Sequence, residues 1–583
     1  MERKLLITLA LILMMPFFTI CAHAAITDCD FSDPADGYID GLDLSQFADY
    51  FATSNSLADV DGIGGINSAD VAHFAGFFGS RYTVTARRPN ILLIIGDDIG
   101  FDVTTDMYPG LIDQLLALYD PSYHDDIDGT PASTPKLNTL AQQGMRFRNA
   151  WAQPVCSPTR ASIITGLFAA KHHVIDFNTP LHPNYDTFVQ KLKTEAGYST
   201  AAFGKWHLGT DGTNGVLPRQ AGFDLYKGIL GAAPSSYWSP NNYVMQNDST
   251  GDEGTVSVTL QPTNLDGIGP TTYLPVVKAA DTIDWINARQ AANPDKPWFA
   301  YVAMNLSHAV AGSPIMVVPD EDTLDAPSRA EIVSCGGSFG SASVGSCDGR
   351  QLMRAMTNSL DTVIGKLLEA VDSIPTDTYV IYVSDNGTPM YSFNSTLGSQ
   401  IGNMYITRGG RGKGTVYESG ARVAMAIKGP DIEPGSESSE FIHVADLFST
   451  ILELAGLTPP VDVSDGTVNG LVPLDAVSLS PILFDGASAV RNPDTGYILT
   501  ENNDILGGNV LKAGARNAKY KVVCANGTGT SNCEFYDLET DPLEEDPRDE
   551  YETTSCGGWG TGDPQWHYCH LIGVINDYSI LAP

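Results

Sequence analysis

Ile91-Leu-Leu-Ile-Ile95, followed directly by Gly96-Asp97-Asp98, is the stretch of sequence that decides the fold. An uninterrupted run of leucine and isoleucine is typical of a strand that is buried on both faces, as in a parallel sheet. A second run of this kind, Tyr379-Val-Ile-Tyr-Val383, leads into Ser384-Asp385-Asn386-Gly387. Open α/β sheets bind ligands beyond the carboxyl ends of their strands, and Ca²⁺ prefers carboxylate and amide oxygens. The two segments therefore predict an α/β fold with a hard-cation site at one edge of the sheet.

Two further apolar segments end in side chains that can take part in chemistry. Thr200-Ala-Ala-Phe203 leads into Gly204-Lys205-Trp206-His207, and the run from Trp298 to Met304 leads into Asn305-Leu-Ser-His308. Each of these residue types alone has an ordinary interpretation, because an aspartate after a strand often caps a turn and a histidine often packs in a core. Their shared position at strand ends favours one common site.

The segment from Cys156 to Gly166 reads Cys-Ser-Pro-Thr-Arg-Ala-Ser-Ile-Ile-Thr-Gly. Proline two residues after the cysteine suits the first turn of a helix, so Cys156 is predicted at a helix N-terminus, where backbone N–H groups and the helix dipole favour an anion. Arg160 lies one turn further on the same face and has the forked geometry that binds sulfate or phosphate oxygens. The alternative is a buried structural cysteine beside an ordinary helix cap.

Together these segments resemble the type I sulfatase family. The family signature, C-x-P-x-R followed by T-G, is matched by Cys156, Pro158, Arg160, Thr165 and Gly166. Further blocks match in family order: Arg88 to Asp98, Thr134 to Gly144, Gly204 to Gly209, Ser384 to Gly387 and Gly412 to Glu418. The resemblance covers roughly residues 88 to 547 and ends in Glu534 to Pro542, which is similar to the family's C-terminal subdomain.

The resemblance implies an alkaline-phosphatase-like α/β sandwich. In this fold helices enclose a large, mostly parallel sheet, and a small antiparallel sheet follows at the C-terminus. Residues 89–475 are expected to form the catalytic domain and residues 476–583 the C-terminal subdomain.

The resemblance also implies a metal site and an oxidised nucleophile. Calcium is expected to bind Asp97, Asp98, Asp385 and Asn386, with the modified Cys156 and a sulfate oxygen completing the shell. An oxygen-only ligand set that includes an amide fits Ca²⁺ better than zinc. A formylglycine-generating maturation enzyme would oxidise Cys156 to formylglycine. One hydroxyl of the hydrated aldehyde then attacks sulfur, and the second lets the sulfated diol expel sulfate.

Five further side chains receive roles from the resemblance. His207 is the expected base for sulfate release, while His308 and Lys413 protonate or stabilise the leaving oxygen. Lys205 and Arg160 hold the sulfate and the modified side chain.

Two short segments depart from the family pattern. Glu418-Ser419-Gly420 stands where Glu-Gly-Gly is common, and His172-His173 stands where His-Gly often follows the signature helix. A change in loop conformation alone would account for either difference, so neither His172 nor His173 is assigned a role.

These expectations describe a sulfuric ester hydrolase that acts on a sulfated polysaccharide, an oligosaccharide or an aryl sulfate. One alternative is a phosphonate or phosphodiester hydrolase of the same superfamily, because kinship of fold does not determine the transferred group. The other is a non-catalytic binding protein anchored through an N-terminal module. The full set of candidate catalytic residues argues against it.

Three parts are predicted ahead of the catalytic domain. A basic start, an apolar stretch and Ala22-His23-Ala24 indicate a secretory signal over residues 1–24, too short and too interrupted for a comfortable membrane span. Residues 25–80 repeat an amphipathic helix, Asp43 to Phe51 and Asp70 to Phe78, each preceded by a loop rich in oxygen ligands. Residues 81–88 are the expected linker.

The two loops resemble the duplicated calcium loops of a dockerin, a small helical module of the EF-hand kind. The expected calcium ligands are Asp59, Asp61, Asn67 and Asp70 in the second loop and Asp36, Asp40 and Asp43 in the first. Such a module would bind a cohesin-like receptor or a cell surface. The alternative is a helical hairpin whose aspartates are only N-caps.

Cysteine spacing and net charge indicate the compartment and exclude some partners. Three locally spaced pairs are predicted to be disulfides of an exported, extracellular or periplasmic protein: Cys335 with Cys347, Cys524 with Cys533, and Cys556 with Cys569. Free buried thiols are the alternative. Cys29 and Cys156 remain unpaired after loss of the signal; they could bridge each other, but the setting of Cys156 argues against it. A net charge of -36 argues against nucleic acid and anionic membranes as partners.

Overall fold

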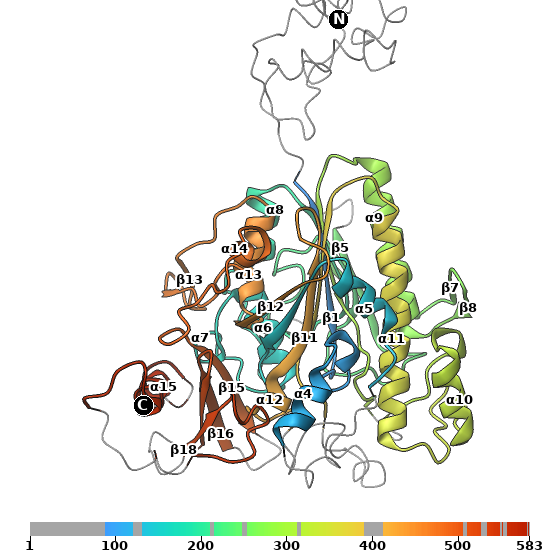
Figure 1. The fold of residues 1–583 in the computed structure, drawn as a ribbon. Coiled ribbons are helices and arrows are strands. Elements are labelled where there is room, and N and C mark those ends of the chain that lie inside the picture. The colour runs from blue at the N-terminus through green and yellow to red at the C-terminus, as the bar shows by residue number, and fades with distance from the viewer. Residues whose placement is uncertain are drawn as a thin grey trace, which may run out of the picture. The chain divides into compact units, whose positions relative to one another are not determined.

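The run of leucine and isoleucine lies in β1 (Asn90–Gly96), a strand with every residue buried at the centre of a large sheet in this computed structural model (Figure 1). Its side chains alternate between two apolar clusters. Leu92 and Ile94 belong to the cluster on one face, while Ile91, Leu93 and Ile95 belong to the cluster on the other. Because both faces carry apolar side chains, the sheet needs cover on both sides.

The structure describes residues 88–119, 131–209, 215–247, 253–311, 316–389, 412–504, 510–525, 533–548, 551, 557–579 and 581. The predicted signal, the calcium-binding repeat and the linker up to residue 87 lie outside these residues. The same holds for the predicted calcium ligands between Asp36 and Asp70.

Ten strands form the large sheet, in the order β12-β2-β11-β10-β1-β9-β3-β4-β5-β6. The four strands predicted from apolar runs are neighbours at its centre and pair in parallel: β10 (Thr378–Ser384), β1, β9 (Trp298–Ala303) and β3 (Ser199–Lys205). Five of the nine neighbouring pairs are parallel and four are antiparallel. The remaining strands are β12 (Ser436–His443), β2 (Met145–Trp151), β11 (Arg422–Lys428), β4 (Leu225–Ile229), β5 (Asn242–Asn247) and β6 (Glu253–Val258).

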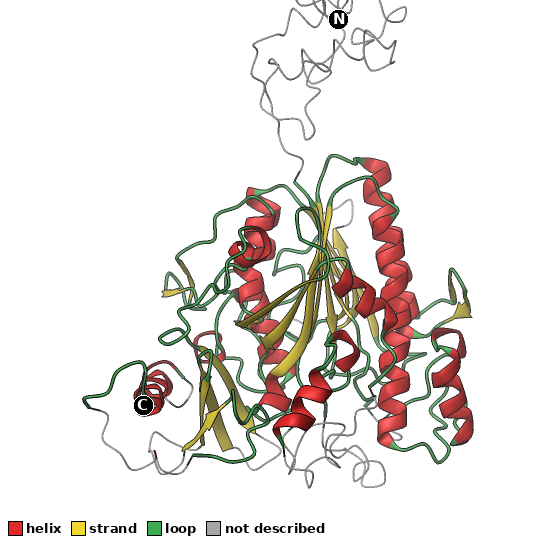
Figure 2. Ribbon diagram, viewed as in Figure 1, coloured by secondary structure: helices red, strands yellow, loops and turns green. Residues whose placement is uncertain are grey.

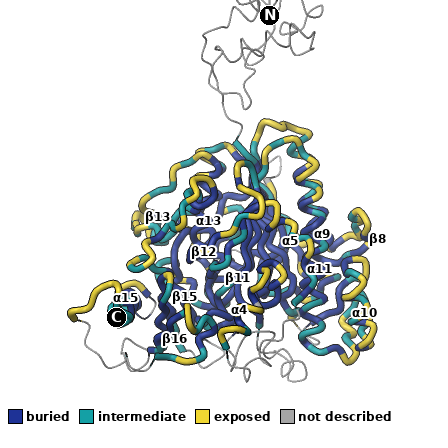
Figure 3. The backbone as a smooth tube through the Cα atoms, viewed as in Figure 1, coloured by how far each residue is buried: buried dark blue, intermediate teal, exposed yellow. Residues whose placement is uncertain are grey.

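Helices cover both faces of this sheet, as Figures 1 and 2 show. The buried side chains of Leu92 and Ile94 share their cluster with residues of α4 (Leu111–Leu118), α5 (Pro135–Gln142), α9 (Leu274–Ala292), α10 (Ala326–Ser334) and α11 (Gly349–Asp372). The opposite cluster includes residues of α6 (Cys156–Thr165), α8 (Phe188–Glu195), α13 (Asp446–Leu454) and α14 (Ser480–Phe484). The buried backbone is concentrated in the sheet and in the helix surfaces that face it (Figure 3). This is the expected helix–sheet–helix sandwich.

A separate four-stranded antiparallel sheet follows near the C-terminus, which confirms the predicted small sheet. Its strands are β15 (Ile498–Asp504), β16 (Val510–Arg516), β17 (Tyr520–Ala525) and β18 (Cys533–Asp537). Helix α15 (Pro564–Tyr578) shares an apolar cluster with this sheet. Short elements complete the described fold: α7 (Ala169–His172), α12 (Glu418–Ala421), the 3-10 helices Thr105–Met107 and Glu321–Thr323, and the hairpins β7 (Thr263–Leu265)–β8 (Ile268–Thr271) and β13 (Asp462–Ser464)–β14 (Leu471–Pro473).

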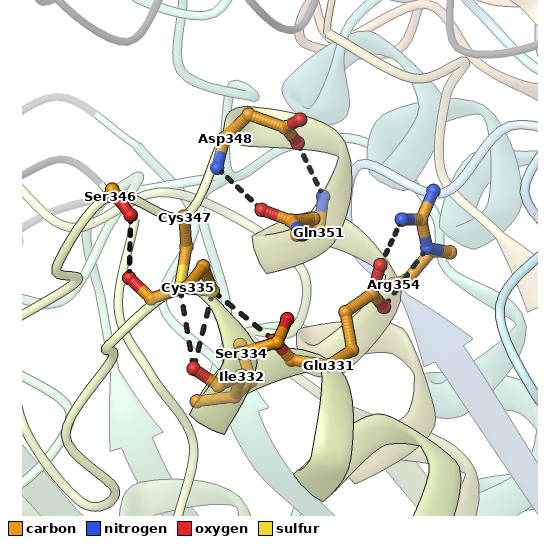
Figure 4. The surroundings of a disulfide bond; sticks show 9 residues. All are labelled: Glu331, Ile332, Ser334, Cys335, Ser346, Cys347, Asp348, Gln351 and Arg354. Atoms are coloured by element: carbon orange, nitrogen blue, oxygen red, sulfur yellow. Dashed lines mark hydrogen bonds and ion pairs between the residues drawn. A yellow bond between two sulfur atoms is a disulfide. The ribbon is translucent and has the colours of Figure 1, made fainter.

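Two of the predicted disulfides are confirmed. The bond between Cys335 and Cys347 joins the end of α10 to the start of α11, and Figure 4 shows it beside the α11 cap. The bond between Cys524 and Cys533 links directly opposed residues of β17 and β18. Cys569 is also disulfide-bonded, and its predicted partner lies outside the described residues. Within the described ranges Cys156 is the free cysteine.

No helix among the described segments is long and apolar enough to cross a membrane.

Asp361 ties α11 to the first turn of α5. Its carboxylate accepts the backbone N–H groups of Lys136 at 3.0 Å and Leu137 at 2.8 Å. Burial raises the pKa of Asp361 from 3.8 to about 7, although the two N–H groups oppose the shift. The folded protein therefore holds this proton more tightly than the unfolded chain does, and the stabilisation from protonation is lost as pH rises from about 4 through 7.

Asp361→Asn is expected to flatten the pH dependence of stability. Asparagine keeps a carbonyl acceptor but does not titrate, so the variant should gain stability relative to wild type between pH 4 and 7, by at most about 1.4 kcal/mol per pH unit. Denaturant unfolding of both proteins across this pH range measures the difference. A constant difference at every pH would contradict the shifted pKa.

Candidate active site

Four strand ends bring the predicted residues together. Gly96 of β1 is paired in register with Ser384 of β10, so Asp97 and Asp98 leave the sheet beside Asp385 and Asn386. On the other side of β1, β9 runs into the segment of Asn305 to His308, and β3 runs into Lys205 and His207. The predicted metal ligands and cations therefore gather at one edge of the sheet, where open α/β sheets place their ligands.

Three buried carboxylates at this edge each face a cation. Lys205 Nζ lies 2.8 Å from Asp97 Oδ2. Arg160 donates to Asp385 Oδ2 through Nη2 at 2.8 Å and through Nε at 3.2 Å. Lys413 Nζ forms an ion pair with Asp98 Oδ1. These side chains are at most 9% exposed, and a buried charge without such a partner would be strongly destabilising.

The neighbouring carboxyl groups of Asp97 and Asp98 differ in their pKa values. Burial and the nearby Asp385 charge raise the pKa of Asp97 to about 8, against the opposing effect of Lys205. The pKa of Asp98 is lowered despite its burial, because the charges of Lys413 and Lys205 and a hydrogen bond from Asn386 favour its ionised form. The carboxyl of Asp97 therefore favours a bound proton or another cation more strongly than the carboxyl of Asp98 does.

The backbone at the site adopts left-handed conformations at two residues that are not glycine. Asp98 has a φ of 63° and His207 a φ of 60°. Such conformations cost free energy and persist where the surrounding structure imposes them, which is frequent at functional sites.

Cys156 is buried at the first position of α6, as predicted. Its Sγ lies 3.1 Å from Nδ1 of His207, and Ser157 next to it donates from Oγ to the His207 carbonyl at 2.9 Å. The first turn of α6 and the loop after β3 are therefore in direct contact at Cys156.

Both predicted catalytic histidines are uncharged at neutral pH. Burial, with the charges of Lys205 and Arg160, lowers the pKa of His207 well below its ordinary value. Burial also lowers the pKa of His308 to about 3, although the Asp98 charge opposes the shift. His308 Nδ1 lies 2.7 Å from the Ala309 carbonyl, to which its N–H donates, so Nε2 is the atom that faces Asp98 at 3.8 Å.

Tyr237 supports the site but has no recognisable signal in the sequence. Tyr237 is buried and donates its hydroxyl to the carbonyls of Asn305 at 2.5 Å and His308 at 2.7 Å. Tyr237 lies more than sixty positions before Asn305 and His308 in the sequence, so only the folded structure brings its hydroxyl to their carbonyls.

The C-terminal sheet contacts the site through β15. Gln153 Oε1, three residues before Cys156, accepts from the backbone N–H of Glu501 at 2.7 Å. Asn502 Nδ2 donates to the Gly414 carbonyl at 2.7 Å, beside Lys413. The backbone N–H of Gly414 donates in turn to the Pro154 carbonyl at 2.8 Å. One strand of the small sheet therefore holds both the cysteine segment and the Lys413 segment.

Two glycines that contact the Glu418–Gly420 segment or belong to it are tightly packed. A Cβ added at Gly387, next to Asn386, would lie 1.9 Å from the Ser419 carbonyl oxygen, and one added at Gly420 would lie 2.1 Å from the Thr415 carbonyl oxygen. Gly387 and Gly420 therefore have no room for a side chain, and Ser419, which directly precedes Gly420, is the position at which this chain departs from the family pattern.

His172 and His173 lie away from the paired carboxylates and cations. His172 is buried, with Nε2 3.0 Å from Ser162 Oγ on α6 and with Nδ1 accepting from the Val174 N–H at 3.1 Å. Burial lowers its pKa to about 3. His173 is exposed and ends α7 in a left-handed conformation. His172 therefore supports the back of the signature helix.

The donor atoms at the sheet edge fit a hard cation. Asn386 Nδ2 donates to Asp98 Oδ1 at 2.9 Å, while its Oδ1 is buried without a hydrogen-bond partner. One ligand atom from each of Asp97, Asp98 and His308 falls within 4.8 Å of the others. With all three carboxyl groups ionised, their charges balance those of the three paired cations. A dication bound there would therefore make the group net positive and attractive to an anion.

Comparisons with known proteins agree with this geometry. A family profile described as Sulfatase matches residues 89–457. The chain is 28% identical over 426 residues to the N-acetylgalactosamine-6-sulfatase of Homo sapiens, covering 68% of this chain and 66% of that protein. It is 26% identical over 459 residues to Arylsulfatase J of Mus musculus, covering 73% of this chain and 62% of that protein. The chain therefore spans about two thirds of the length of these relatives.

Solved structures share the fold at low sequence identity. The PsFucS1 sulfatase from Pseudoalteromonas sp. matches with a TM-score of 0.57 and 19% identity, over 84% of this chain and 91% of that chain. A structure described as BT4656 in complex with its substrate D-glucosamine-2-N,6-O-disulfate matches with a TM-score of 0.54 and 19% identity, over 80% of this chain and 94% of that chain.

Tyr237→Phe is expected to lower turnover without unfolding the protein. The change removes the hydroxyl that donates to the buried His308 carbonyl, whereas the Asn305 carbonyl still accepts the His308 N–H at 2.9 Å. The loss costs about 1–3 kcal/mol of stability and loosens the His308 segment. Steady-state kinetics together with thermal unfolding measures both effects. Unchanged kcat with a folded variant would contradict the positioning role of Tyr237.

Proposed function

The chain belongs to the sulfatase family, and we propose that it hydrolyses sulfate esters at the buried cluster around Cys156. The observation that carries the proposal is the convergence of three carboxylate–cation pairs and two neutral histidines on a cysteine at a helix N-terminus. The cations concentrate positive charge locally in a chain whose net charge is -36. Such a cluster suits an anionic ester whose departing group must be protonated.

Cys156 is the proposed origin of the nucleophile, after oxidation to formylglycine. Burial raises the pKa of its thiol, although Lys205 and Lys413 oppose the shift. An unmodified thiol at this position is therefore protonated near neutral pH and is a weak nucleophile. Oxidation by a formylglycine-generating maturation enzyme would give an aldehyde, which when hydrated supplies a hydroxyl nucleophile.

Asp97, Asp98, Asp385 and Asn386 are the proposed ligands of a calcium ion, with the modified Cys156 beside them. Their carboxylate and amide oxygens, including the unpartnered Asn386 Oδ1, form the kind of donor set that calcium prefers. When bound, the ion would supply a fixed charge that binds sulfate oxygens and lowers the pKa of a coordinated hydroxyl.

The cations and histidines are proposed to divide binding and proton transfer between them. Arg160 and Lys205, held by their carboxylates, orient the sulfate group. His207 is the proposed base, because it is neutral at working pH and its Nδ1 lies 3.1 Å from the Cys156 side chain. His308 and Lys413 are the residues proposed to contact the leaving oxygen and to protonate or stabilise it.

A sulfated carbohydrate is the proposed natural substrate class, and an aryl sulfate a laboratory substrate. Among the similar proteins, one is named for N-acetylgalactosamine 6-sulfate and another binds a sulfated glucosamine as its substrate. The predicted export to the extracellular space or periplasm, and the predicted dockerin-like module with its cohesin-like receptor, suit an enzyme that acts on environmental polysaccharide. The alternative function is that of a phosphonate or phosphodiester hydrolase with the same site.

Wild-type protein is expected to favour a sulfate ester over a phosphate diester. The value of kcat/KM for 4-nitrophenyl sulfate should exceed that for bis(4-nitrophenyl) phosphate by on the order of a hundredfold. Cys156→Ala should lower kcat for the sulfate by about four orders of magnitude or more while thermal unfolding stays close to that of wild type. Dominant diesterase activity would overturn the proposal, and substantial turnover by Cys156→Ala would exclude its nucleophilic role.

Calcium removal is expected to abolish turnover, and added Ca²⁺ to restore it. Asn386→Ala removes one neutral oxygen ligand, so the calcium concentration for half-maximal activity should rise by about 10-fold or more. Asn184→Ala, at an exposed position elsewhere on the surface, is the matched control and should leave the requirement unchanged. An unaltered calcium requirement in Asn386→Ala would remove Asn386 from the proposed ligand set.

A further inference from the structure

A cavity of about 350 Å³ opens beside the nucleophile segment. Ser157, His207 and Leu208 line it together with Phe177, Asn178 and Thr179. His207 is the residue that lies against Cys156, so the cavity adjoins the place where the ester reacts. Its volume is within the range of small-molecule binding sites, on the order of 300–1,000 Å³.

The loop that carries Phe177, Asn178 and Thr179 is preorganised. The Asp176 carboxylate accepts from the backbone N–H of Asn178 at 2.8 Å and from Thr179 Oγ1 at 2.9 Å. The loop is then anchored where the backbone N–H of Leu181 donates to the carbonyl of Leu208, another lining residue, at 2.9 Å. These bonds hold the wall of the cavity in one conformation before any ligand arrives.

The chemistry of the wall suits an uncharged polar ring. Phe177 is half-buried and offers an apolar surface, while the exposed Asn178 amide makes no hydrogen bond to another described residue and offers both a donor and an acceptor. None of the described lining residues is lysine or arginine. The nearest fixed charge of the loop is the Asp176 carboxylate beneath Asn178.

We propose that this cavity binds the sugar ring that carries the sulfate, and that it selects a ring without a carboxylate. The proposal rests on the proposed sulfatase function and adds a substrate class to it: sulfated neutral hexoses or N-acetylhexosamines rather than sulfated uronic acids. A uronic acid would bring a second anion into a wall that offers it no cation and has a carboxylate close behind. Asn178 determines this specificity by hydrogen bonding to ring hydroxyl or acetamido groups.

Kinetics with three kinds of substrate test the proposal. The neutral rings are the 4- and 6-sulfates of galactose, N-acetylgalactosamine and N-acetylglucosamine. The charged ring is glucuronic acid 2-sulfate, and 4-nitrophenyl sulfate reports the chemistry without a sugar. Wild-type protein should turn over at least one neutral ring with kcat/KM about tenfold or more above that of the charged ring.

Three variants separate the cavity from the chemistry. Asn178→Ala should lower kcat/KM for the best neutral ring by about fivefold to tenfold, and Asn178→Lys should shift the preference toward glucuronic acid 2-sulfate. Both should keep turnover of 4-nitrophenyl sulfate within about twofold of wild type. Asn184→Ala, a second exposed asparagine outside the lining, should match wild type on every substrate.

The outcomes distinguish this proposal from the function on which it rests. Equal losses on the sugar and aryl substrates in Asn178→Ala, or a wild-type preference for the charged ring, would overturn the cavity assignment while leaving the sulfatase function in place. If wild-type protein cleaves no sulfate ester at all, the proposed function fails and the cavity assignment fails with it.

Discussion

Three carboxylates lie almost completely buried at the carboxyl edge of the central sheet, and each one is matched by a cation from a different part of the chain. Removing charged groups from water is costly, and the cost is met only when the partners and hydrogen bonds are well placed. The matching cations come from the signature helix α6, from the end of β3 and from the segment before α12. The three buried ion pairs therefore fix the positions of these three elements relative to the edge of the sheet.

The small C-terminal sheet also contacts the candidate active site, although none of its described residues is a candidate catalytic residue. Strand β15 holds the segment before Cys156 through Glu501 and Gln153, and it holds the segment of Lys413 through Asn502 and Gly414. Both anchors are hydrogen bonds between buried groups, which are costly to leave unmade. The small sheet thus positions two loops of the large sheet relative to each other.

Much of this arrangement could be predicted because its determinants are local. The apolar runs around Ile91 and Tyr379 specify buried strands, and the polar residues after them must meet once those strands are parallel neighbours. Pro158 places Cys156 at a helix start, and the spacing of two cysteine pairs anticipates their disulfides.

The remaining features depend on contacts between distant segments. The donors from Tyr237 to the His308 segment, and from Glu501 to Gln153, join residues whose side chains have no local pattern. The antiparallel pairing of β4 with β5 is not predicted by the sequence either, because both strands are short and half-buried and so have weak periodicity. The sequence does not predict the cavity wall at Asn178, because its shape comes from a turn organised by Asp176.

The central claim is that the buried cluster serves a nucleophile made from Cys156. Mass spectrometry of the peptide that spans Cys156, taken from natively produced, active protein, tests it most directly. The account predicts the residue mass of formylglycine in place of cysteine, with an aldehyde that reacts with a hydrazine reagent. An unmodified thiol in fully active protein would contradict it.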